Sequence, residues 1–205
     1  EYGCIPHPTI PHFGASPDGI CDIGSKNKKY VGRMLEIKCP KSRVIDEFIP
    51  EHYELQVQGQ LEVCDLDYCD YLECSITEYQ NFEEFEEDSS DVISLTPDKQ
   101  EKGVIIETYD TKMDKDIYYY LYDFDSKESI DKWIQETNTH IMENLDYLVW
   151  KKITYWKLNK YSVKLVKRDK ERFKNTMLPE INSFWDDVLH YRKIGYESLI
   201  YKPHK

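Results

Sequence analysis

Hydrophobic and polar positions alternate along the chain with two different periods, which predicts both strands and helices. Two short apolar stretches, residues 20–23 and 30–37, flank a polar and basic linker, a pattern typical of a β-hairpin. Pro40 closes the second of these strands. Pro50 suits the start of a helix, which we expect to run to about Cys64.

The rest of the chain continues this mixture of strands and helices. Strands are expected where aromatic and β-branched residues alternate, at residues 68–76, 103–109, 117–122 and, as one long strand or two, 149–166. Helices are expected at residues 129–148 and 169–192, where apolar positions recur at helical spacing. This order predicts an α+β fold, with a mixed sheet and helices packed on it.

Composition narrows the class of protein. The chain has 205 residues with 40% hydrophobic content, which is enough to bury a core and predicts a single domain. The formal net charge is −12, which argues against wrapping nucleic acid over a large surface. A local basic groove or an acidic metal site remains compatible with it. The acidic stretch at residues 82–91 predicts an exposed loop or short helix, with a protein-contact segment as the alternative.

The lengths of the apolar runs and the spacing of the cysteines indicate in which cellular compartment the protein is expected. No run of about 20 apolar residues is present, so no membrane partner is expected. The six cysteines lie within the first 74 residues without a CxxC spacing, which favours free thiols in a reducing, intracellular compartment. A zinc site is the alternative, from ligand types that suit zinc: Cys4, His7, His12 and Cys21.

The candidate catalytic and metal-binding residues lie in or next to the expected hairpin. Asp18 lies in the turn Ser-Pro-Asp-Gly, and Glu36 and Lys38 flank Ile37 on the second strand. Residues i and i+2 of a strand share a face, so Glu36 and Lys38 are expected to project together while Ile37 points into the core. Two carboxylates and a backbone carbonyl suit a hard cation such as Mg²⁺ or Mn²⁺. An ordinary surface ion pair is the alternative interpretation.

Three segments in this region resemble those of a known family. They are Gly-Ala-Ser-Pro-Asp-Gly at residues 14–19, Leu-Glu-Ile-Lys-Cys-Pro at 35–40, and Ile-Pro-Glu-His-Tyr-Glu-Leu-Gln-Val-Gln-Gly-Gln-Leu at 49–61. Together they resemble the lambda-exonuclease or YqaJ-type viral recombinase nucleases of the PD-(D/E)xK superfamily. The resemblance is strongest over residues 12–76. The acidic, Tyr-rich middle resembles members from giant DNA viruses of the mimivirus type.

The resemblance implies a role for each matching residue. Asp18 and Glu36 would be metal ligands for Mg²⁺ or Mn²⁺, with the carbonyl of Ile37 as a third, and Lys38 would be the catalytic lysine. Gln56 or Gln58 would complete the site; their spacing puts them on different faces of the helix, so only one is expected to do so, and Gln56 is preferred. Tyr53, a candidate DNA contact, lies one helical turn before Gln56 and faces the same way. Ser16 would contact a phosphate. The alternative for Gln56, Gln58 and Gln60 is an ordinary polar helix face.

Basic residues near the hairpin are candidate DNA contacts. They are Lys26, Lys28, Lys29, Arg33, Lys41 and Arg43. A second basic cluster runs from Lys160 to Lys174 and would serve as a DNA track or as an interface with the acidic segment of a neighbouring subunit. A solvated basic turn is the alternative for the first cluster.

The chain departs from the family pattern in two places. Family members carry an acidic residue about ten positions before the Asp of the turn, where this chain has His7, a metal ligand or a loop residue. They also carry an upstream helical segment, which we expect to lie before Glu1. The resemblance therefore implies a PD-(D/E)xK nuclease core within one domain, residues 1–205. Its expected parts are a catalytic core at about 12–76, an acidic insertion at about 80–100, and a C-terminal strand and helix at 149–195.

These observations lead to two functional hypotheses. The first is a metal-dependent deoxyribonuclease that hydrolyses phosphodiester bonds, a 5′–3′ double-strand exonuclease by resemblance, with endonuclease activity open. It would act in viral recombination, repair or defence, in the host cytoplasm or a viral factory. Its expected partners are double-stranded DNA, further copies of the chain in a dimer or trimer, and a single-strand annealing protein. The second hypothesis is a catalytically inactive nuclease-fold scaffold or protein-interaction module.

Overall fold

The computed structural model describes residues 3–41 and 43–200, and their contacts gather into two compact units. Unit 1 comprises the described residues within 1–38, 46–72 and 163–205, and unit 2 comprises those within 39–45 and 73–162. Two long strands, β5 (Tyr68–Glu78) and β8 (Leu148–Lys167), contribute residues to both units. The structure therefore has two units, each with its own core, and the single domain expected from chain length stays a prediction.

The sheet of unit 1 begins with the predicted hairpin. β3 (Gly19–Ile20) pairs antiparallel with β4 (Met34–Lys38), with Gly19 opposite Leu35 and Ile20 opposite Met34. The hairpin is confirmed, but its strands are shorter than expected because Lys28–Tyr30 form a 3₁₀ turn, η1. The Asn27 side chain caps this turn by accepting a hydrogen bond from the Lys29 N–H.

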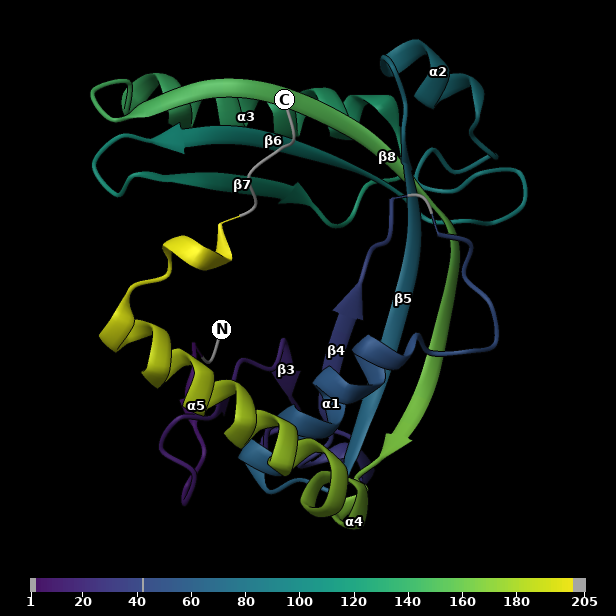
Figure 1. Cartoon of the computed structure of the whole chain (residues 1–205). Helices are drawn as coiled ribbons and strands as arrows, with labels where there is room; N and C mark the ends of the chain where they lie inside the picture. The colour runs from purple at the N-terminus through teal and green to yellow at the C-terminus, as the bar shows by residue number, and fades with distance from the viewer. Residues whose placement is uncertain (1–2, 42, 201–205) are drawn as a thin grey trace, which may run out of the picture. The chain divides into compact units, whose positions relative to one another are not determined.

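Helix α1 (Glu51–Cys64) connects β4 to β5 and covers one face of these two strands (Figure 1). A helical crossover joins parallel strands, so β4 and β5 run in the same direction. β8 runs the other way, since the Arg168 N–H just after its end donates to the carbonyl of Asp67 just before β5 (2.9 Å). The strand order in unit 1 is β3–β4–β5–β8, and the mixed sheet expected from the sequence is confirmed.

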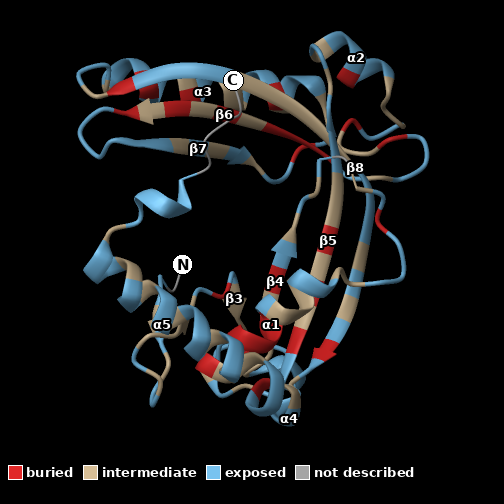
Figure 2. Ribbon diagram, viewed as in Figure 1, coloured by how far each residue is buried: buried red, intermediate tan, exposed pale blue. Residues whose placement is uncertain are grey.

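The core of unit 1 lies between α1 and the sheet. Its buried members come from β4, α1, β5 and β8: Met34, Val57, Leu61, Cys69, Tyr71 and Val166. Figure 2 shows this burial concentrated on α1 and the facing parts of β4 and β5. Five consecutive α1 residues, Val57–Leu61, are buried, because the short strands β1 (Ile5–Pro6) and β2 (Gly14–Ala15) also contact this helix. This all-round burial explains why the apolar pattern of the helix is uneven in the sequence.

A continuous helical stretch closes unit 1. It consists of α4 (Lys170–Arg172), a π-helical segment η2 (Phe173–Met177) and α5 (Leu178–Ile194), followed by the short 3₁₀ helix η3 (Glu197–Leu199). The expected helix at 169–192 is therefore confirmed, with a widened turn inside it. Pro179 accounts for the widening, since its ring cannot pack against the carbonyl of Asn175, four residues earlier, in α-helical geometry.

Within unit 2 the strand order is β5–β8–β6–β7. β6 (Lys102–Asp110) pairs antiparallel with both β8 and β7 (Lys115–Leu121). Helix α3 (Lys127–Glu143) ends five residues before the expected residue 148, because Leu148 already pairs with Asp110 as the first residue of β8. The alternating stretch at 149–166 is therefore a single strand.

The acidic segment of unit 2 contains a short helix, α2 (Phe82–Glu87), as expected for part of residues 82–91. Asn81 caps it, and Phe85 anchors it in a core with Ile93, Val104 and Ile130. Across the described part of the chain, no helix combines the length and apolar character needed to cross a membrane.

Replacing Leu61 by alanine tests the core of unit 1. Leu61 is 0% exposed, and the cavity left by Leu61→Ala should lower the free energy of unfolding by about 2–5 kcal/mol. Urea denaturation followed by circular dichroism measures this difference. Leu165→Ala is the matched control, since Leu165 is 56% exposed and its loss should change the free energy by less than about 0.5 kcal/mol. Equal effects of the two substitutions would contradict the assigned core.

Candidate active site

Strand β4 presents Glu36 to the buried side of its sheet. Glu36 is 2% exposed and shares a face with the fully buried Met34, whereas Ile37 is 41% exposed on the opposite face. The expectation that Glu36 and Lys38 share a face holds, but the expectation that Ile37 points into the core is wrong. Met34 determines which face of the strand is buried, and Glu36 two residues later must follow it. A carboxylate in this position requires compensating donors.

Asp18 lies one residue before β3, next to β4. The antiparallel register sets Gly19 opposite Leu35, which brings the preceding residue, Asp18, to the part of β4 that follows Leu35. The exposed Asp18 side chain accepts a hydrogen bond through Oδ2 from the Ile37 N–H at 2.7 Å. This bond fixes the Asp18 carboxylate beside the strand that carries Glu36 and Lys38.

Lys38 and Gln56 form a three-membered network with Glu36. Lys38 Nζ donates to Glu36 Oε1 at 2.5 Å and to Gln56 Oε1 at 3.0 Å. Gln56 Nε2, from α1, donates to the same Glu36 Oε1 at 2.8 Å. The amide of Gln56 thus links the lysine to the carboxylate, and its position agrees with the preference for Gln56 in the sequence analysis.

Gln60 contributes a contact that the sequence analysis did not expect. Its Nε2 donates to Glu36 Oε2 at 2.8 Å and to the carbonyl of Ser16 at 3.1 Å. Both oxygens of the buried carboxylate therefore have donors. The spacing of Gln56 and Gln60, four residues on one helix, is the sequence signal that could have revealed this residue.

Gln58, on the same helix, binds backbone groups and does not contact Glu36 in the described structure. Its Nε2 donates to the carbonyl of Lys167 at 2.9 Å, and its Oε1 accepts from the Asp169 N–H at 2.8 Å. Gln58 therefore fastens α1 to the end of β8, away from Glu36, and serves the fold of unit 1.

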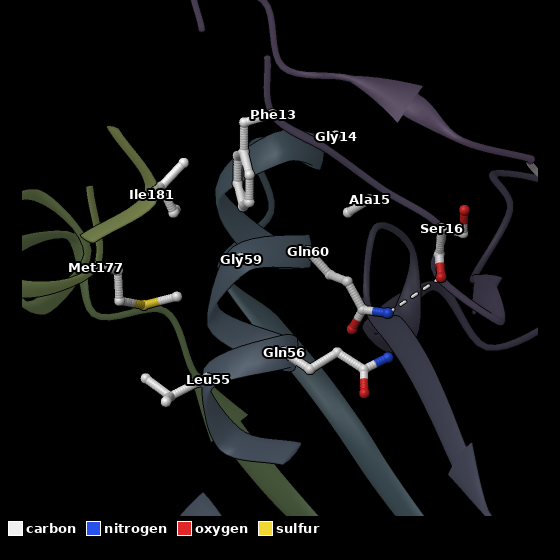
Figure 3. Close-up of a pocket in the computed structure, with 10 residues that line it drawn as sticks. All are labelled: Phe13, Gly14, Ala15, Ser16, Leu55, Gln56, Gly59, Gln60, Met177 and Ile181. Atoms are coloured by element: carbon white, nitrogen blue, oxygen red, sulfur yellow. Dashed lines mark hydrogen bonds between the residues drawn. The ribbon is translucent and has the colours of Figure 1, made fainter. Parts of the chain in front are cut away.

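A cavity of about 370 Å³ adjoins the network (Figure 3). Its lining combines polar side chains with an apolar wall: Phe13, Gly14, Ala15, Ser16, Leu55, Gln56, Gly59, Gln60, Met177 and Ile181. In Figure 3 the side chains of Gln56 and Gln60 extend from α1 toward the segment that carries Ser16. Ser16 is exposed beside this cavity, and its hydroxyl is available to an incoming group.

Two further residues shape the surroundings of the network. The ring of Tyr53 lies 4.8 Å from Lys38 Nζ, in cation–π range, so Tyr53 faces the site as its helical spacing predicts. Cys69 on β5 is fully buried nearby, and burial together with the Glu36 charge raises the pKa of its thiol to about 12. The thiol is therefore protonated at neutral pH and acts as a small packing group.

His7 is held within its own loop. Its Nδ1 accepts hydrogen bonds from the N–H groups of Thr9 and Ile10, both at 3.1 Å, and its ring stacks on Phe173. Among the described contacts, none joins His7 to Asp18 or Glu36, so the structure favours the loop interpretation over metal ligation. The zinc alternative also finds no support in residues 3–41 and 43–200, where no group of three or more His, Cys, Asp or Glu side chains is arranged to hold a metal ion.

The candidate DNA contacts differ in whether their side chains already have a partner within the protein. Lys26, Lys29 and Lys41 are exposed, and Lys28 is exposed but donates to the carbonyl of Ile23. Arg33 forms an ion pair with Asp70 at 3.1 Å and stacks over Tyr30. Arg43, which like Lys41 belongs to unit 2, pairs with Glu73. The lysines are therefore the stronger candidates for phosphate contacts.

The second basic cluster is partly structural. Arg168 pairs with Glu62 and Asp65, and its guanidinium lowers the pKa of Asp65. Arg172 pairs with Glu54 at 2.9 Å. These two arginines fasten the corner after β8 to α1, whereas Lys167, Lys170 and Lys174 are exposed.

Comparison with known proteins shows what the chain resembles. Residues 1–67 match the family of the YqaJ-like viral recombinase domain, so this part of the chain is similar to that family. All of Asp18, Glu36, Lys38, Gln56 and Gln60 lie within this match. The chain is also 36% identical over 222 aligned residues to a protein of Acanthamoeba polyphaga mimivirus, described as uncharacterized protein R354.

The alignment with the mimivirus protein covers 94% of this chain and 40% of that relative. The chain thus spans about two fifths of the length of the relative it matches. The resemblance to YqaJ-type proteins of giant viruses, inferred from three short motifs, is confirmed.

Substitution of the two carboxylates tests the described hydrogen bonds. The amide oxygen introduced by Asp18→Asn can still accept from the Ile37 N–H, so this change should alter the free energy of unfolding by less than about 1 kcal/mol. In Glu36→Gln, one carboxylate oxygen is replaced by an amide N–H₂, which then faces an N–H donor in place of an acceptor. This change should lower the free energy of unfolding by about 1–3 kcal/mol. Urea denaturation of the two variants gives the comparison, and a larger loss in Asp18→Asn would contradict the assigned burial of Glu36.

Proposed function

We propose that this chain carries the nuclease centre of a viral recombination protein and hydrolyses phosphodiester bonds of DNA with the help of Mg²⁺ or Mn²⁺. The observation that carries the proposal is the hydrogen bond of Asp18 to the backbone of the strand that bears Glu36 and Lys38, inside the part of the chain that matches the YqaJ-like viral recombinase domain.

The donor set fits a hard divalent cation. Asp18 and Glu36 supply carboxylate oxygens, and the carbonyl of Ile37 is the proposed third ligand. Mg²⁺ is bound in proteins through one or two carboxylates and keeps several water molecules, so a larger cluster of acidic residues is not required. When bound, such an ion polarises a phosphate oxygen and lowers the pKa of a coordinated water.

The neighbouring side chains have roles that follow from their contacts. Lys38 brings a positive charge next to Glu36, where it can orient the attacking water or stabilise charge that develops on the phosphate. Gln56 fixes both Lys38 and Glu36 through its amide, and the Tyr53 ring limits the movement of the ammonium. The Ser16 hydroxyl is the proposed contact for a phosphate oxygen beside the cavity.

Double-stranded DNA is the proposed substrate, and 5′–3′ exonuclease action is the proposed mode. The exposed lysines around the hairpin, Lys28, Lys29 and Lys41, are the proposed phosphate contacts, with Arg33 and Arg43 as further candidates. The proposed setting is the host cytoplasm or a viral factory. A dimer or trimer, and cooperation with a single-strand annealing protein, are part of the same proposal.

A non-catalytic scaffold is the second candidate function. The chain's net charge of −12 and the loop position of His7, where the family has an acidic residue, favour it. The complete network around Glu36 argues against it, because a scaffold has no need to keep a carboxylate buried.

Cleavage assays separate the two functions. The unmodified chain should degrade linear double-stranded DNA with Mg²⁺ or Mn²⁺ and not with EDTA, and loss of circular DNA would add endonuclease activity. Asp18→Asn should reduce the rate by about 100-fold or more, since even outer partners of metal ligands are worth about 10- to 100-fold. Gel electrophoresis of end-labelled DNA measures the rates.

Asp22→Asn is the matched control for this assay. Asp22 is an exposed carboxylate four residues away in the same hairpin, and its Oδ1 likewise accepts a backbone N–H, that of Gly24. Its loss of charge should leave cleavage within about two-fold of the unmodified rate, as expected for a surface change away from the site. Full activity of Asp18→Asn, or no cleavage by the unmodified chain with either metal, would overturn the proposed nuclease.

A further inference from the structure

Gln60 occupies a position that links the two halves of the candidate site. The segment with Asp18 and the strand with Glu36 are separate along the chain, and Gln60 donates to both: to the Ser16 carbonyl, two residues before Asp18, and to Glu36 Oε2. Because both bonds come from one amide nitrogen, the Ser16 carbonyl and the Glu36 carboxylate are held at a fixed separation.

The orientation of this amide is determined by its partners. Both contacts at Nε2 are oxygen acceptors, so exchange of the amide oxygen and nitrogen would place an oxygen against two other oxygens. Nε2 must therefore face Glu36, and Oε1 is left buried with no hydrogen-bond partner among the described residues. An unsatisfied buried oxygen is costly, which indicates that stability alone does not explain this side chain.

Neighbouring residues of α1 show what an ordinary structural glutamine does on this helix. Gln58 and Gln60 are both 2% exposed, but Gln58 satisfies its amide nitrogen and oxygen with backbone partners at Lys167 and Asp169. Gln60 instead directs its donor to a carboxylate that Lys38 and Gln56 already contact through its other oxygen.

From these contacts we propose that Gln60 is a positioning residue, which sets the Glu36 carboxylate relative to the Asp18 turn so that the two can bind one divalent cation. The inference rests on the proposed function, since it assigns Gln60 to the metal site of the nuclease. Gln60 does not itself touch the ion or the DNA. Without it, Glu36 Oε2 loses its described donor and the Ser16 backbone loses its tie to α1.

Binding of Mn²⁺ to the DNA-free chain provides a test that does not depend on cleavage. Isothermal titration calorimetry of Gln60→Leu should show Mn²⁺ affinity weakened by about 10- to 100-fold, the range for loss of a partner of a metal ligand. Gln58→Leu is the matched control: it removes an equally buried amide from the same helix and should leave Mn²⁺ affinity within about two-fold, because its partners lie outside the site. Thermal melting shows that both variants are folded at the titration temperature.

Cleavage rates measured over a series of Mn²⁺ concentrations give the second readout. Gln60→Leu should need a higher Mn²⁺ concentration for half-maximal cleavage, by a factor similar to its loss of affinity, whereas Gln58→Leu should not. Equal Mn²⁺ affinities for the two variants would overturn the role of Gln60. If the unmodified chain binds no Mn²⁺ and cleaves no DNA, the proposed function itself fails, so the two failures are distinguishable.

Discussion

The burial of the Glu36 carboxylate is the constraint on which the candidate site depends. A charged group withdrawn from water needs donors for both oxygens, and these come from Lys38 on its own strand and from Gln56 and Gln60 on α1. The strand and the helix must therefore meet at one distance and in one register. Met34, Val57 and Leu61 supply the apolar contacts that hold them there.

The position of Asp18 depends on different interactions from those of Glu36. It stays exposed, and its position depends on the short β3–β4 pairing and on one hydrogen bond to the Ile37 N–H. The two carboxylates thus have contrasting environments, one with three polar side-chain partners and one open to solvent. An open carboxylate next to a fixed one is a suitable arrangement for a site that admits a charged substrate from water.

Much of this organisation could be predicted from the sequence, because local signals determine it. The strand before Pro40 and the helix beginning after Pro50 each depend on residues close together in the chain, and both are observed, with a bend at Asp18 in the Ser-Pro-Asp-Gly segment. The buried face of β4 was predicted incorrectly. Glu36 and Ile37 compete for the core, and an isoleucine is normally the one buried. Besides Lys38, the donors that compensate Glu36 lie 20 and 24 residues further along, and a strand pattern does not reveal them.

Helix α1 combines two functions in one element. Its residues alternate between packing and site: Val57 and Leu61 fill the core, while Gln56 and Gln60 hold Glu36. Unfolding of α1 would therefore disrupt the core of unit 1 and, at the same time, remove Gln56 and Gln60 from Glu36. The candidate site therefore depends on the folded state of α1, and any activity of the site should be lost together with the core of unit 1.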